Sequence, residues 1–140
     1  MSFNEKSAWV MFVVLLIPTG LYFSSVYYLS AAIGYLIEPS VPKLIMYTII
    51  LVILSIVGQT LIALSSPKDA NAGSDERDKI IETKAGHWSG YVLGFGAVTG
   101  LIHYLAFNQG SMLFYIIFGS LIISQLIEYL MQIMLYRRGY

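Results

Sequence analysis

Residues 44–64 read LIMYTIILVILSIVGQTLIAL, an apolar run without a lysine or an arginine. A helix rises 1.5 Å per residue, so about 20 apolar residues span the hydrocarbon core of a bilayer. The run is continuous rather than alternating, and in lipid only helices and closed barrels satisfy the backbone. The segment is therefore predicted to be a transmembrane helix.

Three further runs have the same character and cover residues 8–29, 86–107 and 112–136. The composition agrees, because 57% of the chain is hydrophobic and only 11% is charged, whereas a soluble domain has about a quarter charged residues. We predict an all-α four-helix transmembrane bundle that forms a single membrane domain over residues 1–140. Pro18 in the first run is expected to kink its helix, because proline removes one backbone hydrogen bond.

The positive charges predict how the bundle is oriented. Cytoplasmic loops of membrane proteins carry an excess of lysine and arginine. With four spans, seven of these residues fall on one side of the membrane and only Lys43 on the other. The N-terminus, the C-terminus and the loop over residues 65–85 are therefore predicted to be cytoplasmic, at a bacterial cytoplasmic membrane. The seven residues are Lys6, Lys68, Arg77, Lys79, Lys84, Arg137 and Arg138.

The two helical hairpins share sequence features at similar spacing. One interpretation is a parallel repeat about an axis along the membrane normal. The other is that membrane helices resemble one another by composition, and the sequence leaves both open. The matching elements are Thr19-Gly20-Leu21 with Thr99-Gly100-Leu101, and Ser55, Gln59 and Leu61 with Ser124, Glu128 and Leu130.

Glu128 is the only acidic or basic side chain well inside a predicted span. Such a group costs about 2.5–3.5 kcal/mol unless it is paired or hydrated. Ser124, Gln125 and Gln132 flank it at helical spacing, and Gln59 is expected to meet it at matching depth. Two interpretations follow: a proton or cation site, or a polar contact between helices.

Glycines recur every fourth residue along the third span. Gly86, Gly90 and Gly94 lie on one face, and Gly96 and Gly100 on another. Small residues at this spacing let helices approach closely. They predict tight packing, either within the chain or between copies of it.

A charged segment leads into the third span, and it is predicted to be a cytoplasmic helix continuous with that span. Ser74 is expected to be its N-cap, with acidic residues near the positive end of the helix dipole. Three carboxylates on one face form either a solvated surface, which we favour, or ligands of a hard divalent cation. These carboxylates belong to Asp75, Asp78 and Glu82.

The charged segment has a pattern that is shared with a known group of proteins. The pattern is Asp75-Glu76-Arg77-Asp78, followed by Ile81, then Lys84-Ala85 and a transmembrane helix. It resembles a group of small bacterial multi-pass membrane proteins of uncharacterised function. The resemblance covers about a quarter of the chain and brings no catalytic residues. It implies an accessory or regulatory role, with a partner-facing surface formed by Asp75, Glu76, Arg77, Asp78, Glu82 and Lys84.

Composition narrows the function further. The chain has no cysteine and two histidines, which excludes thiolate chemistry and a histidine-only metal site. His87 and His103 are assigned to the aromatic belts at the inner and outer membrane interfaces. We predict no enzyme activity, cofactor, metal or nucleic-acid partner.

The preferred function is an accessory or regulatory protein that contacts a protein partner through residues 65–85. The alternative is a small oligomeric transporter or channel using the intramembrane carboxylate.

Overall fold

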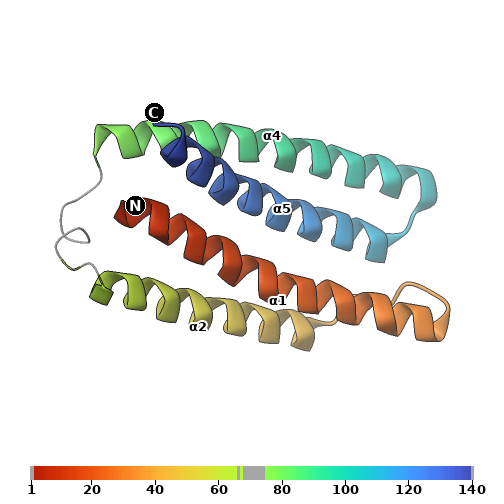
Figure 1. Ribbon diagram of the computed structural model, residues 1–140. Coiled ribbons are helices and arrows are strands. Elements are labelled where there is room, and N and C mark those ends of the chain that lie inside the picture. Colours follow the sequence, from red (N-terminus) through yellow and green to blue (C-terminus); the bar gives the residue numbers. More distant parts are fainter. Residues whose placement is uncertain (1, 66, 68–74, 140) are drawn as a thin grey trace.

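The computed structural model describes residues 2–65, 67 and 75–139. This part of the chain forms four long helices and no strand, so the all-α fold is confirmed (Figure 1). Each helix is long and apolar enough to cross a membrane, and the chain is a multi-pass membrane protein. The helices are α1 (Phe3–Ile33), α2 (Val41–Ser65), α4 (Glu76–Phe107) and α5 (Gly110–Arg137).

Each predicted span lies inside one of these helices. The helices extend beyond the apolar runs, and local capping groups define where they end. Ser2 begins α1, because its Oγ accepts a hydrogen bond from the Glu5 N–H at 3.2 Å. Gly34 and Asn108 end α1 and α4 in the left-handed conformation, at φ 80° and 55°. Glycine and asparagine adopt this conformation at the least steric cost. Within α1, Pro18 does not end the helix, and a kink there stays a prediction.

The start of α4 differs from the sequence prediction by one residue. Asp75, not Ser74, is the N-cap, and Ser74 lies outside the described residues. The Asp75 carboxylate accepts from the backbone of the first turn, and the Asp78 carboxylate accepts from the Asp75 N–H at 3.1 Å. This reciprocal pair is a capping box. As predicted, the charged segment and the third span form one unbroken helix.

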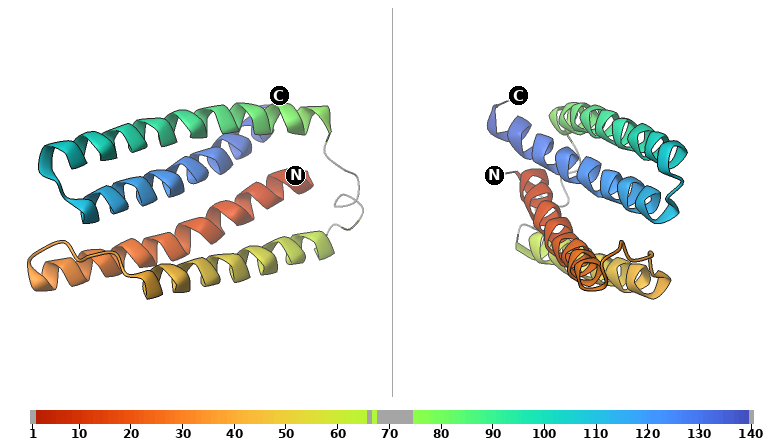
Figure 2. Two further views of the ribbon diagram at one scale, coloured as in Figure 1. Left: turned by 180° about the vertical axis from the view of Figure 1, so that it is seen from behind. Right: turned by 90° about the vertical axis from the view of Figure 1, so that its right-hand side faces the viewer.

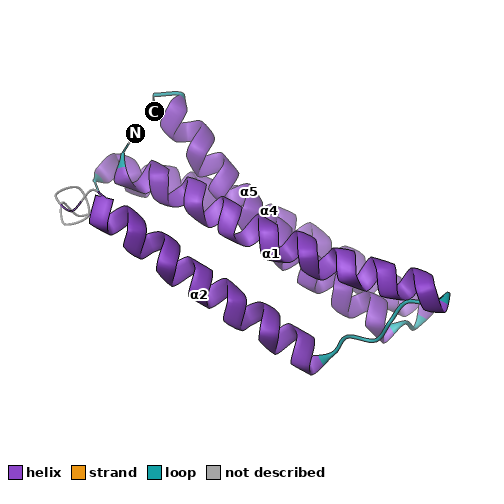
Figure 3. Ribbon diagram, turned by 60° about the horizontal axis from the view of Figure 1, so that its bottom comes forward, coloured by secondary structure: helices purple, strands orange, loops and turns teal. Residues whose placement is uncertain are grey.

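The helices run up and down, so that both termini lie at one end of the bundle and both short connections lie at the other (Figures 1 and 2). The main packing contacts join α4 to α5, α5 to α1, and α1 to α2. Helices α1 and α5 are therefore the inner pair, and α2 and α4 flank them (Figure 1). Figure 3 shows α2 beside α1 and apart from the other helices. A repeat would equate inner α1 with outer α4. The two hairpins thus occupy unequal positions, and the sequence repeat stays a prediction.

Aromatic side chains form the centre of the core near the connection between α1 and α2. Tyr22, Tyr47 and Tyr115 are buried there, and Tyr22 lies 5.4 Å from both Tyr47 and Phe118 between ring centroids. The Tyr115 hydroxyl donates to the carbonyl of Ile37 at 3.2 Å, which ties α5 to the loop between α1 and α2. Buried tyrosines therefore hold α1, α2 and α5 together.

The two glycine faces of α4 behave differently. A Cβ on Gly96 would overlap the side chain of Ser120, and one on Gly100 would lie 3.1 Å from Ile116. This face permits the close approach of α5, as predicted. A Cβ on Gly86, Gly90 or Gly94 would meet nothing within 4 Å, so the prediction that this face packs within the chain is wrong. Helix α5 covers only the other side of α4.

A glycine on α2, Gly58, also sets a helix spacing, and it was not predicted from the sequence. A Cβ on Gly58 would lie 2.6 Å from Cγ1 of Val10, at the contact of α2 with α1. Gly58 has no glycine partner one turn away on α2. The repeated glycine spacing of α4 is therefore absent on α2.

Candidate functional site

Glu128 lies on α5 where this helix faces α4, and its carboxylate accepts hydrogen bonds from two side chains. The Ser89 hydroxyl of α4 donates to Glu128 Oε2 at 3.2 Å, and Gln125 Nε2 donates to the same oxygen at 3.3 Å. Ser89 also bonds the carbonyl of Gly86 at 3.0 Å. The structure therefore brings Glu128 together with one predicted neighbour, Gln125, and with Ser89, which the sequence analysis missed.

Gln59 does not meet Glu128, which corrects the sequence prediction. Its amide pairs with Ser7 of α1, at 2.7 Å from Nε2 to the Ser7 oxygen and 3.1 Å from that oxygen to Oε1. The reason is the order of the helices, because α2 packs on α1 while Glu128 faces α4. Matching depth along the membrane normal did not specify which helices are neighbours.

The other predicted members of the intramembrane site do not complete a polar path. Ser124 is buried and donates to the carbonyl of Leu121 at 2.8 Å, while Gln132 is half-buried. Neither Glu128 nor Gln59 lines the cavity between α1 and α2 or the depression along α4. The arrangement around Glu128 is that of a polar contact between packed helices.

The charged start of α4 packs against the end of α5 through its Asp78 side. The Tyr136 hydroxyl donates to Asp78 Oδ1 at 2.7 Å, and Arg77 Nη2 donates to the Tyr136 carbonyl at 3.2 Å. The Arg77 guanidinium also lies 5.8 Å from the centre of the Tyr136 ring. Below these groups Ile81 and Ala85 are fully buried. We call this group of five residues the α4 clamp.

The six residues predicted to face a partner fall into two groups, those that are bonded or half-buried and those that are exposed. Asp78 and Arg77 bond Tyr136, and Lys84 is half-buried. The remaining three, Asp75, Glu76 and Glu82, are exposed. Within the described residues no three acidic or histidine side chains form a metal-ligating group. Asp78 bonds Tyr136, and the choice between a solvated surface and a cation site stays a prediction.

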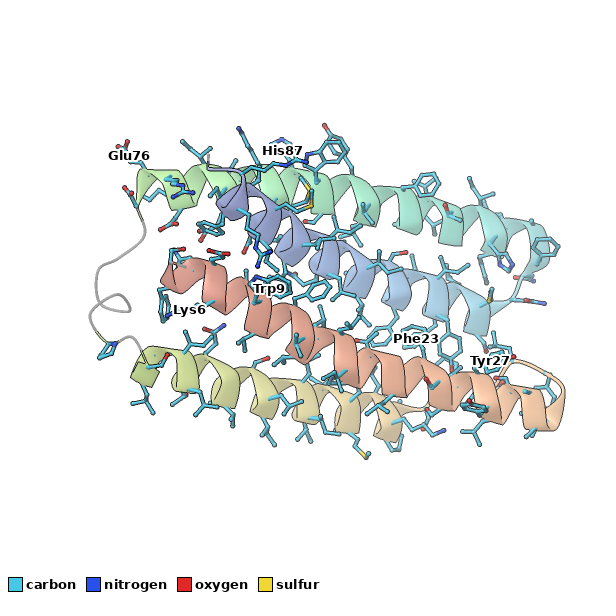
Figure 4. All side chains as sticks on the ribbon, viewed as in Figure 1. Lys6, Trp9, Phe23, Tyr27, Glu76 and His87 are labelled. Carbon is cyan, nitrogen blue, oxygen red and sulfur yellow. The ribbon has the colours of Figure 1, made fainter. Side chains whose placement is uncertain are left out.

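A second link at the same end joins α1 to α5, and the sequence analysis missed it. Glu5 is buried, and its Oε1 lies 3.7 Å from Nε of Arg137. The Arg137 guanidinium lies 5.4 Å from the centre of the Trp9 ring, and Figure 4 shows Trp9 on the side of α1 that faces α5. An even number of spans places the first turn of α1 and the last turn of α5 on the same side of the membrane, but it does not make the two helices neighbours. The sequence therefore indicated a shared membrane side for Glu5 and Arg137 but not their contact.

The histidines take separate positions on α4. His87 is exposed on the outer side of the helix, with its ring 6.4 Å from that of Tyr91 (Figure 4). His103 is half-buried, 4.8 Å from the Phe107 ring, and its Nδ1 has no hydrogen-bond partner among the described residues. Their assignment to the membrane interfaces stays a prediction.

No protein-family model, no curated protein and no solved structure matches this chain. The resemblance carried by residues 75–85 therefore stays a prediction.

Proposed function

We propose that this chain is a small accessory or regulatory protein of a bacterial cytoplasmic membrane, which presents the start of α4 to a protein partner. The observation that supports this most is the α4 clamp. Its hydrogen bonds from Tyr136 to Asp78 and from Arg77 to Tyr136 fix a charged helix turn that continues directly from a membrane span.

The length of α4 supports a projection into solvent. Its 32 residues measure about 48 Å at 1.5 Å per residue, against about 30 Å of hydrocarbon. About 18 Å of helix therefore extends beyond the hydrocarbon core if the other end lies at its border. Because the charged residues lie in the first turns, this extension includes the clamp.

The exposed side of the extension has the composition of a small docking surface. Glu76, Lys79, Ile80 and Thr83 follow one another at helical spacing, and all four are exposed. The Ile80 side chain has 49% of its surface exposed and lies between charges of both signs. An apolar anchor with a polar rim is typical of protein interfaces. A surface held in one orientation also loses less conformational entropy when it binds.

The test is photo-crosslinking in intact cells, with a photoreactive amino acid at position 80 of the full chain. The matched control carries it at position 98, because Val98 has a comparable exposed fraction of 56% on the same helix but lies in its apolar part. We expect a discrete protein adduct at position 80 and none at position 98. Lys79→Glu should weaken the adduct, because it reverses a charge at the rim.

Three outcomes would count against the proposal. The absence of an adduct at position 80, or equal adducts at both positions, would remove the docking surface. An adduct of twice the mass of the chain would replace the protein partner by a second copy.

A further inference from the structure

A groove runs between α1 and α2 on the side of the bundle away from α4. It has a volume of about 490 Å³, within the range of ligand-binding cavities. Pro18, Tyr22 and Tyr47 form its buried floor, and exposed apolar side chains such as Leu21 and Ile50 form its rims. Neither Glu128 nor the α4 clamp contributes to it.

Two of the three hydroxyl groups along the groove have hydrogen-bond partners, and the third belongs to Tyr22. The Tyr47 hydroxyl lies 2.9 Å from the hydroxyl of Thr19, and the Ser25 hydroxyl donates to the Tyr22 carbonyl at 2.8 Å. The groove therefore offers hydrocarbon surface rather than hydrogen bonds from these side chains. This suits an alkyl chain better than a polar solute.

The length of the groove corresponds to one leaflet of a bilayer. On α2 its lining runs from Lys43 to Leu54, which is about 16 Å at 1.5 Å per residue. The hydrocarbon core is about 30 Å thick, so one leaflet accounts for about half of that. The groove begins in the first turn of α2, where the chain enters the apolar region, and ends near the middle of the span.

A single positive charge marks the outer end of the groove. Lys43 is exposed, and its ammonium group makes no ion pair among the described residues. Every other lysine and arginine that the structure describes lies in α1, α4 or α5 near the opposite end of the bundle, or directly after α5. Glu38, in the loop before α2, is the acidic residue at this end. A lysine at a membrane interface attracts anionic lipid headgroups.

We propose that the groove binds one acyl chain of an anionic phospholipid, whose phosphate lies at Lys43. This inference is independent of the proposed partner surface, which lies at the other end of the molecule. It rests on three matched features: an apolar lining, a depth of one leaflet, and an unpaired cation at the headgroup level.

The headgroup is tested by native mass spectrometry of the full chain in detergent. Phosphatidylglycerol and phosphatidylethanolamine with identical acyl chains compete for the protein. We expect one retained lipid and about a fivefold preference for phosphatidylglycerol, the effect of one basic residue near an anionic lipid. Lys43→Gln should abolish the preference, whereas Glu38→Gln at the same end should keep it.

The acyl chain is tested by filling the groove. Ser25→Phe places a ring in the lining, whereas Ser24→Phe places the same ring on the neighbouring residue outside the lining. Both serines are exposed, so neither change crowds the core. We expect Ser25→Phe to reduce retention of both lipids at least severalfold and Ser24→Phe to leave it as in the wild type.

Specific outcomes would overturn the proposal. Equal retention by the two phenylalanine variants would show that the groove holds no chain. A preference for phosphatidylglycerol that survives Lys43→Gln would remove the headgroup assignment. If inorganic phosphate alone raised the thermal stability as much as phosphatidylglycerol, Lys43 would be a simple anion site. Helicity measured by circular dichroism checks that each variant is folded.

Discussion

At the scale of single residues, Glu128 shows how neighbouring side chains supply hydrogen-bond donors to a carboxylate inside a membrane bundle. Its Oε2 accepts hydrogen bonds from Ser89 on α4 and from Gln125 one turn earlier on α5. Hydrogen bonds between transmembrane helices contribute about 0.6 kcal/mol on average. A contact of this kind stabilises the packing of α4 on α5 modestly.

Glu128→Gln should therefore fold and change the free energy of unfolding by less than about 1 kcal/mol, because glutamine can accept the same hydrogen bonds. The measurement is thermal unfolding in detergent, for the wild type and the variant, in sodium and in potassium. We expect the two proteins to respond equally to both cations. A stabilisation by one cation in the wild type alone would favour the transporter or channel alternative.

Tyr136→Phe tests the α4 clamp, because it removes the hydroxyl that donates to Asp78 at 2.7 Å. Hydrogen bonds to charged groups contribute about 1.5–3 kcal/mol, and partial exposure should reduce this to about 1 kcal/mol. Hydrogen exchange should also become faster in residues 76–85. The control is Tyr27→Phe, which removes a hydroxyl from a tyrosine with 70% of its surface exposed. Equal behaviour of the two variants would mean that this bond does not hold the segment.

At the scale of elements, one helix carries two glycine faces with opposite roles. On α4, Gly96 and Gly100 admit α5, while Gly86, Gly90 and Gly94 face open space. The spacing is the same on both faces, so only the neighbouring helix distinguishes them. For the open face, the predicted packing between copies of the chain stays a prediction.

Gly96→Ala should lower the free energy of unfolding by about 1–3 kcal/mol, since an added Cβ overlaps Ser120 and forces α4 away from α5. Gly90→Ala is the matched control, and it should leave thermal stability in detergent nearly unchanged. Equal losses of thermal stability in both variants would contradict the close packing of α4 against α5 at Gly96. A loss of self-association in Gly90→Leu, measured by light scattering, would assign the open face to a second copy.

At the scale of the whole molecule, the ends of the bundle differ in charge. The termini and the start of α4 share one end, and Ser40 and Gln109 lie at the other (Figure 2). In the part of the chain that the structure describes, Lys43 is the one lysine or arginine at the latter end. This asymmetry predicts which end faces the cytoplasm.

Single cysteines test the orientation cleanly, because the chain has none of its own. Ser40→Cys and Gln109→Cys should react with a membrane-impermeant thiol reagent in intact cells. Asn71→Cys, which falls outside the described residues, should react only after the membrane is permeabilised. Labelling at position 71 alone would reverse the predicted topology.

The sequence by itself determined the four helices, their class and their approximate limits. A span must satisfy its backbone internally and expose apolar side chains to lipid, and both requirements are local. The continuity of the charged segment with α4 was also readable, because helix-forming residues run into the span without a break. Only the details of the ends differed, such as Asp75 replacing Ser74 as the N-cap.

The tertiary structure alone decided which helices are neighbours. Lipid tails are as apolar as leucine, so apolar residues surround each helix and no periodic pattern marks the inward face. Which helices pack together depends instead on a few contacts between residues far apart in the sequence, such as Gln59 with Ser7 and Tyr136 with Asp78. Depth and spacing are properties of one helix, whereas these contacts depend on two. For this reason the sequence predicted the spans correctly but paired Gln59 with the wrong helix.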